Sequence, residues 1–456
     1  MKTTHLLYAV AVLGSGACDY NIANPNSPEP IGTNPSRSAV AAATTGILIA
    51  ARSDLADWVL DAGIIGREAY RFDGSDPRFV SEFLVGPLDP GSAAFGGDHW
   101  FEHFRTIRST NNLVNVIGTA TALSAAEQNA TRGFAETFQA LSFLGILDAH
   151  TQDSIPLAVN QPVTVAPAPY VSNDSAYTFM SALLDSARAH LAAGGSAFPF
   201  TLPAGFTGLE TPANFIKFNR ALKARVEVYR GSRGCGNPCY TAALTALGAS
   251  FIDTTSAATL NIGAYMDFGT GPGDIPNFLA QDPQTSDNLV HPMLEDSAET
   301  QTGGGLDARF LAKTVSRPSR TVSGLTADRS FQNYPTPGSS IPIIRNEELI
   351  LLRAEANNNV GTGVEVAADV NYVRVNSGGL AAIGGLAAQT APQRLDVILH
   401  ERLYSLLYEG GHRWIDMRRT GKLAGIPLDR VGDVRHATLP IPTDECLARA
   451  ANPSQC

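Results

Sequence analysis

The sequence predicts a mostly helical protein that carries one long irregular insertion. Apolar residues recur at the i, i+3, i+4 spacing of an α-helix in successive segments from residue 38 onward. These segments are similar in length and are joined by short turns, as in paired helices. The stretch 252–342 reads as an irregular insertion, and 28 prolines and 42 glycines imply many loops. With 456 residues the chain can bury a large core.

The N-terminus has the layout of a secretory signal. Lys2 precedes a short apolar run at 6–13, and small residues lead up to Cys18. The run is too short to span a bilayer. We therefore predict a signal peptide at 1–17, with plain secretion as the alternative to lipid attachment at Cys18, whose position resembles a bacterial lipobox. Residues 18–37, rich in Asn, Pro and Ser, are predicted to form a tether before a domain that spans 38–456.

The other four cysteines form two close pairs in the sequence. Cys235 and Cys239 make one pair, and Cys446 and Cys456 make the other. In an exported chain this even number predicts two local disulfides. The alternative for the first pair is a redox or metal site, but its spacing is C-x3-C and no histidine lies nearby in the sequence.

The predicted helices follow one another along the chain. The segment at 38–62 is Ala-rich, and Arg52, Asp54 and Asp57 argue against a membrane span there. The helix at 124–149 begins with a capping box, in which Ser124 is followed three residues later by Glu127. The remaining predicted helices lie at 99–118, 170–191, 214–231, 240–250, 347–358, 364–375 and 395–407.

The segment 395–423 carries more charge than a solvated helix face needs. Its acidic and basic residues alternate in sign and stand three to five positions apart, so carboxylate–guanidinium pairs can close across helix turns. We predict a structural salt-bridge network, and the alternative is a pair of catalytic carboxylates. The predicted members are Glu401, Arg402, Glu409, Arg413, Asp416 and Arg418.

The same residues, together with Trp414 and Gly421, resemble the C-terminal signature of the SusD/RagB family of surface lipoproteins. Weaker ordered matches extend through the helices at 99–118, 124–149 and 347–375. Three departures stand out: Ser405 replaces a second glutamate, Gln139 replaces an arginine, and Gly410-Gly411-His412 holds one residue more than usual.

The resemblance implies an α-solenoid of tetratricopeptide type with four helix pairs. It also implies a non-catalytic lipoprotein on the surface of a bacterial outer membrane, with no cofactor. Such a protein would capture an oligosaccharide or a peptide and deliver it to a TonB-dependent, SusC-like barrel.

Two loop-rich stretches, 71–97 and 252–342, are the expected ligand-binding surfaces, because function concentrates on loops held by a rigid frame. Aromatic faces beside amide and carboxylate groups suit a glycan. The alternative is that these rings only fix the loops to the helices. The candidate ligand-binding residues are Phe72, Phe79, Phe95, Trp100, Tyr265, Phe268, Phe331, Asn333 and Tyr334.

An enzyme is the alternative of a different class. His99, Glu102 and His103 form a His-x-x-Glu-His pattern, which can hold zinc in an exported metal-dependent hydrolase. Such a site needs a third ligand from elsewhere, and the same segment carries the apolar residues of a packing helix. The chain has no Gly-x-Ser-x-Gly and no phosphate loop, so we predict no metal site and no enzyme. A net charge of −10 disfavours a nucleic-acid partner.

Overall fold

The computed structural model describes residues 31–92, 96–150, 155–162 and 164–449. Predictions that concern 1–17, Cys18, Phe95 or Cys456 lie outside these residues. The helices are α1 (Arg37–Arg52), α2 (Leu55–Ile65), α3 (Arg78–Val85), α4 (Gly97–Ile117), α5 (Ala125–Ala149), α6 (Asn173–Ala192), α7 (Pro212–Arg230), α8 (Asn237–Gly248), α9 (Met293–Asp296), α10 (Ala308–Lys313), α11 (Asn346–Val360), α12 (Gly363–Asn376), α13 (Ala391–Ser405), α14 (His412–Arg419) and α15 (Thr443–Ala448).

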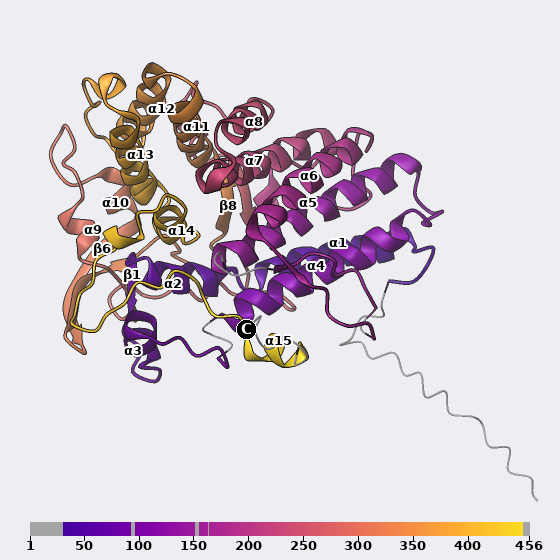
Figure 1. Cartoon of the computed structure of the whole chain (residues 1–456), viewed down its shortest axis with the longest axis horizontal. Helices are drawn as coiled ribbons and strands as arrows, with labels where there is room; N and C mark the ends of the chain where they lie inside the picture. Colours follow the sequence, from indigo (N-terminus) through magenta and orange to yellow (C-terminus); the bar gives the residue numbers. More distant parts are fainter. Residues whose placement is uncertain (1–30, 93–95, 151–154, 163, 450–456) are drawn as a thin grey trace, which may run out of the picture.

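The long helices pack in a nearly linear order. α1 packs on α4, α4 on α5, α5 on α6, α6 on α7, and α7 on α8. α8 then packs on α11, which also contacts α12 and α13. Figure 1 shows the resulting row of helices, with α1 and α4 at one end and α12 and α13 at the other, while α2 lies beside α14. Neighbour-on-neighbour packing of helix pairs is the architecture of a tetratricopeptide-like solenoid, so the predicted fold class is confirmed.

The stretch Arg37–Ile65 is long and apolar enough, by length and composition, to cross a membrane. Here it is divided into α1 and α2 around Ser53 and Asp54. α1 packs on α4 and α5, and most of α2 is buried. Asp54 and Asp61 both bind the His99 ring, so polar partners inside the protein hold this stretch. We therefore assign both helices to the folded domain, with α2 in its core and α1 packed on it by one face.

The ends and the interior of α5 follow from its sequence. Its predicted capping box is confirmed: the Glu127 amide donates to Ser124 Oγ at 3.3 Å, and the Ser124 amide donates to Glu127 Oε2 at 2.8 Å. Inside, phenylalanines of α5 meet those of α7 and the 198–206 segment. Their rings form a continuous aromatic cluster of Phe134, Phe138, Phe198, Phe200, Phe206, Phe215 and Phe218.

The insertion at 252–342 is more regular than the sequence predicts. A four-stranded antiparallel sheet has the order β1-β5-β7-β6, and only β1 lies outside the insertion. Ser323 and Gly324 have φ values of 52° and 81°, which gives the β6–β7 hairpin a tight two-residue turn. The strands are β1 (Ala69–Arg71), β2 (Ile155–Pro156), β3 (Tyr170–Val171), β4 (Gly263–Met266), β5 (Asn288–Val290), β6 (Thr314–Val322), β7 (Leu325–Phe331) and β8 (Ile341–Arg345).

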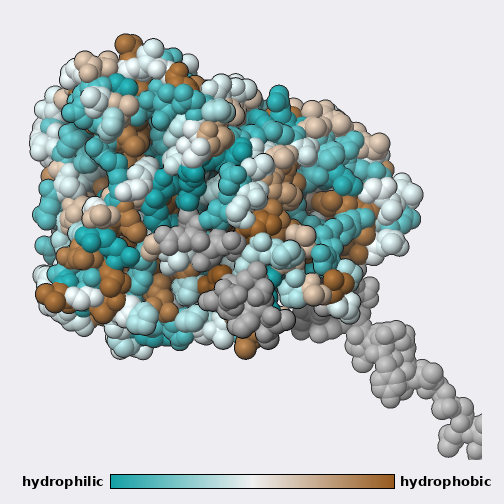
Figure 2. Space-filling model, viewed as in Figure 1, coloured by the Kyte–Doolittle hydropathy of each residue, from teal (hydrophilic) through white to brown (hydrophobic). Residues whose placement is uncertain are grey.

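One of the two predicted disulfides falls within the described residues. The predicted Cys235–Cys239 disulfide is present, with a Cα–Cα distance of 5.9 Å. It joins the turn after α7 to the start of α8, and so fixes the connection within that helix pair. Figure 2 shows that hydrophobic residues on the visible face are scattered among hydrophilic ones.

Candidate functional site

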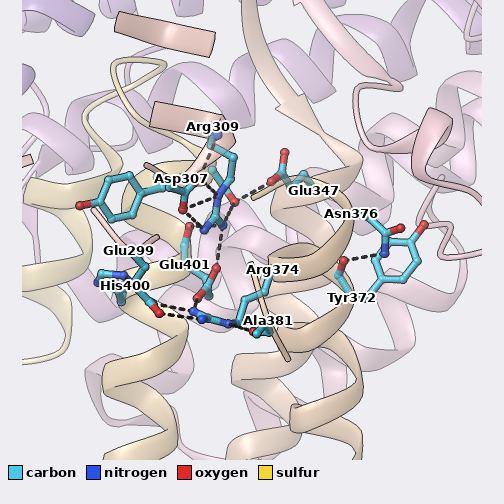
Figure 3. Close-up of polar contacts among 12 residues, drawn as sticks. Glu299, Asp307, Arg309, Glu347, Tyr372, Arg374, Asn376, Ala381, His400 and Glu401 are labelled. Atoms are coloured by element: carbon cyan, nitrogen blue, oxygen red, sulfur yellow. Dashed lines mark hydrogen bonds and ion pairs between the residues drawn. The ribbon is translucent and has the colours of Figure 1, made fainter. Parts of the chain in front are cut away.

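The charged residues of the C-terminal segment are buried, and most of them are paired. Glu401 on α13 is fully buried and binds two guanidinium groups, those of Arg374 and Arg309. The Arg309 contact measures 2.7 Å between Nη1 and Oε2. Arg309 also binds Asp307, and Arg374 also binds Glu299 (Figure 3). One carboxylate of α13 thus joins α12 to the insertion.

A second group of charges centres on Glu409, which lies between the end of α13 and the start of α14. Glu409 accepts from Arg345 Nε at 2.9 Å and from Lys313 Nζ at 2.7 Å. Arg345 also pairs with Glu347. Ser405, which replaces a glutamate of the family pattern, donates to Glu347 Oε1 at 2.6 Å and accepts from Arg309 Nη1 at 3.1 Å. The shorter side chain therefore still links the two groups of charges.

The third group joins α14 to α11 and α13. Arg402 donates to Asp416 through Nε at 2.6 Å. Arg419 binds Asp416 as well, at 2.9 Å, and makes two bonds of 2.5 and 2.6 Å to the Glu355 carboxylate. Arg402 and Arg419 have no exposed side-chain surface, so these pairs are sealed from solvent.

Two predicted members of the network make different contacts. Arg413 Nε donates to the Gly66 carbonyl at 2.9 Å. Arg418 donates to the carbonyls of Trp414, Ala437 and Asp148. We correct the expectation of carboxylate pairing for both residues. From α14 their guanidinium groups reach backbone carbonyls, which accept hydrogen bonds from them in place of carboxylates. Burial lowers the pKa of Arg418 to about 9, against the opposing effect of Asp148.

The electrostatics of the network favour structure over catalysis. Burial raises the pKa of Glu347, but Arg345 and Ser405 more than offset it and lower the pKa to about 2. Arginine partners outweigh burial in the same way at three other carboxylates and lower the pKa of Glu348, Glu409 and Asp416. A general acid or base needs a pKa near the working pH. These four carboxylates instead stay charged and paired.

The three residues of the zinc-like pattern serve separate contacts. The His99 ring lies between two carboxylates, 2.7 Å from Asp54 Oδ2 and 3.0 Å from Asp61 Oδ2. Burial lowers the pKa of His99, but these two aspartates outweigh it and raise the pKa well above its usual value. Glu102 binds Ser53 and Arg105, while the ring of His103 packs against Gly145. Within the described ranges, no three His, Cys, Asp or Glu side chains converge on a metal-sized site.

Most of the predicted ligand-binding rings are buried, which corrects that expectation for six residues, the five given below and Phe268. Phe72 stacks on Tyr70, and Phe79 stacks on Phe83. Phe331 stacks on Tyr408 with centroids 3.8 Å apart. The reason is shared: all of these rings belong to the main hydrophobic core of the protein. The exposed fractions are Phe72 1%, Phe79 8%, Trp100 1%, Phe331 8% and Tyr334 5%.

The other candidates differ in their exposure to solvent. Phe268 is also buried, at 8% exposure, with Arg52 lying over its ring. Tyr265 and Asn333 are partly exposed, but their side chains donate to the carbonyls of Asn261 and Leu407. Phe95 is outside the described residues. The predicted aromatic platform is therefore not assembled at these positions.

The structure reveals a depression that the sequence predictions missed. It lies between α4, α5, α6 and the segment after β2, and has a volume of about 230 Å³. Asn111 and Gln139 lie in its floor, and Phe179 stands at its edge with 36% of its surface exposed. Two sequence signals pointed here: Phe179 falls outside the buried stripe of its helix, and Gln139 replaces the arginine of the family pattern.

Comparison with known proteins identifies the architecture. Residues 300–431 match the sequence profile of the SusD family. No curated protein sequence matches the chain. Among solved structures, NanU of B. fragilis is similar over 91% of this chain and 95% of its own, with a TM-score of 0.67 and 15% identity.

Two other solved structures agree with this result. A SusD superfamily protein of Parabacteroides distasonis has a TM-score of 0.67, 16% identity and coverage of 91% and 98% of the two chains. The surface glycan-binding protein A of Bacteroides uniformis has a TM-score of 0.65, 17% identity and coverage of 90% and 98%. At such low identities these similarities establish the fold, and the profile match places the family signature on the segment that holds the ion network. The chain thus carries the SusD family profile over residues 300–431 and has the fold of SusD superfamily structures.

Proposed function

We propose that the protein is a non-catalytic, surface-exposed lipoprotein that captures an oligosaccharide and delivers it to a TonB-dependent, SusC-like barrel in the bacterial outer membrane. The observation that carries this proposal is the SusD fold, which extends over nine-tenths of the chain. Capture of a peptide is the variant of the same function. A glycan is favoured because one similar structure is named as a surface glycan-binding protein.

The attachment to the membrane rests on the N-terminal sequence. We propose that 1–17 is removed as a signal peptide, that Cys18 receives lipid, and that 18–37 tethers the domain 38–456, with its insertion at 252–342. A flexible tether lets the domain hinge above a barrel and raises its local concentration there. A Cys446–Cys456 disulfide and the lack of a nucleic-acid partner belong to the same proposal, as expected for an acidic exported protein.

The test of attachment is a fractionation experiment. The wild type should incorporate an alkyne-tagged fatty acid and sediment with outer membranes, whereas Cys18→Ala should lose the label and leave the membrane fraction. Retention of the Cys18→Ala variant in washed membranes would refute lipid anchoring.

The test of capture is an array that carries oligosaccharides and peptides, probed with the mature chain. Binding to oligosaccharides supports the proposal, and binding to peptides alone moves it to the peptide variant. Co-purification of an outer-membrane barrel with the wild type from mild detergent supports delivery. Its absence after crosslinking in intact cells would contradict a permanent complex.

A further inference from the structure

The depression between α4, α5 and α6 has a lining that is polar but uncharged. Asn111, Gln139, Asn160 and Gln161 line it together with Phe143 and Phe179. Among the residues that the structure describes, this lining includes no acidic or basic side chain. Such a lining favours a neutral ligand, because it offers no opposite charge to offset the desolvation of an anionic or cationic one.

Two amides in the floor leave hydrogen-bonding groups unused. Gln139 Nε2 donates to Asn111 Oδ1 at 2.6 Å, which fixes the two side chains against each other. Both residues are more than nine-tenths buried, at 8% and 7% exposure. Their remaining groups, Asn111 Nδ2 and Gln139 Oε1, make no hydrogen bond within the described part of the chain. The floor thus offers one donor and one acceptor side by side.

The rim of the depression is held in place by its own contacts. Asn115 and Asn160 exchange amide hydrogen bonds of 2.8 and 2.9 Å between α4 and the segment after β2. The Arg108 guanidinium binds the Gln161 carbonyl through both terminal nitrogens at 3.1 Å. These contacts fix the segment before any ligand arrives, so binding would need little ordering of the chain.

Phe179 provides an exposed ring at the edge. Its neighbours Ala176, Tyr177 and Met180 point into the core, whereas Phe179 stands out from α6. The buried ring of Phe143 meets it edge-on, with centroids 5.5 Å apart and planes at 86°. The platform is therefore fixed in orientation while one part of it stays open to solvent.

We infer that this depression is a subsite for one neutral sugar ring of the captured oligosaccharide, an assignment that rests on the proposed function. A pyranose carries an apolar C–H face and a rim of hydroxyls, each of which both donates and accepts. One hydroxyl donates to Gln139 Oε1, its neighbour accepts from Asn111 Nδ2, and the C–H face rests on Phe179. The sugar then takes the place of water at two amide groups that have no partner among the described residues.

The test uses the mature chain and the best neutral oligosaccharide from a glycan array. Binding is measured by titration calorimetry for the wild type, Phe179→Ala and Gln139→Met. The matched control is Leu311→Ala on α10, because Leu311 is exposed to a similar degree, 38% against 36% for Phe179. Each variant is compared by circular dichroism and melting temperature, so that loss of folding is detected separately.

We expect Phe179→Ala to weaken binding about tenfold and Gln139→Met about fivefold, with the control within about twofold of the wild type. If a glycan binds equally well to all four proteins, the subsite is refuted while the proposed function stands. If only peptides or acidic glycans bind and Phe179→Ala weakens them, the assignment to a neutral sugar is refuted. If no oligosaccharide or peptide on the arrays binds, the proposed function is refuted. Transfer NMR with methyl glycosides then tests the subsite by itself. A wild-type signal that vanishes in Phe179→Ala supports it, whereas no wild-type signal, or one that the variant keeps, refutes it.

Discussion

Glu401 and Glu299 form a matched pair for measuring what the buried network contributes. Both carboxylates bind Arg374 in the same cluster (Figure 3), but the Glu401 side chain is 0% exposed and that of Glu299 is 43% exposed. Glu401 also binds Arg309, whose side chain is 3% exposed. Replacing each glutamate by glutamine keeps its shape and removes its charge.

We expect Glu401→Gln to lower the free energy of unfolding by about 3 kcal/mol, because it leaves two buried guanidinium groups with one carboxylate each. The exposed pair is screened by solvent, so Glu299→Gln should cost less than about 1 kcal/mol. The assay is urea unfolding followed by tryptophan fluorescence, with the midpoints compared at equal slope. Equal effects of the two substitutions, or a loss below about 1 kcal/mol for Glu401→Gln, would refute the claim that burial sets the value of these pairs.

Two further predictions follow from buried groups elsewhere in the core. Ser405→Ala should lower stability by about 2 kcal/mol in the same assay, since it removes the hydroxyl that joins Glu347 to Arg309; an unchanged midpoint would show that the hydroxyl is dispensable. Burial raises the pKa of Glu68 from 4.5 to about 8, so the folded state holds this proton more tightly than the unfolded state, and stability falls as pH rises between those values. Glu68→Gln should therefore be as stable as the wild type near pH 4 and more stable than it by up to about 5 kcal/mol at pH 9. A pH-independent difference between the two proteins would contradict the burial argument.

The helical frame could be predicted because its signals are local. The period of the apolar residues and the Ser124 capping box each lie within one helix. The same reasoning missed the sheet in the insertion. Its hairpin was legible in the Ser323-Gly324 turn, but the partners of β5 lie on β1 and β7, far away in the sequence. Pairing at that distance leaves no local pattern.

The network was predicted in part for a similar reason. Alternating charges on one segment revealed Glu401, Arg402, Glu409 and Asp416, but their partners Arg309 and Arg345 come from distant elements. Arg413 and Arg418 have the same local pattern and bind carbonyls instead. Charge spacing shows that a residue needs a partner, and only the fold decides which partner it meets.

The candidate rings illustrate the limit of composition as a guide to a binding surface. Aromatic residues in a loop between glycines and prolines suit a ligand and suit a seal equally well, and most such rings are buried. Phe179 was overlooked because it belongs to a helix, where aromatic residues are expected to pack. What distinguishes it is its position outside the stripe of Ala176, Tyr177, Met180 and Leu184. An aromatic residue that lies off the apolar stripe of its helix is thus a better indicator of a candidate binding surface than the aromatic content of a loop.

The network also explains how the insertion is fastened to the helices. Helix α10 of the insertion supplies Arg309 to Glu401 and Lys313 to Glu409, both near the C-terminal end of α13. The attraction within a buried ion pair is largely cancelled by the cost of desolvating the two charges, so the net stabilisation is small. The pair is favourable only when the two groups meet in hydrogen-bonding geometry, and this requirement fixes their relative position. Apolar packing alone would let α10 slide along α13. Paired charges at two points instead fix its register, and with it the position of the β6–β7 hairpin that follows α10.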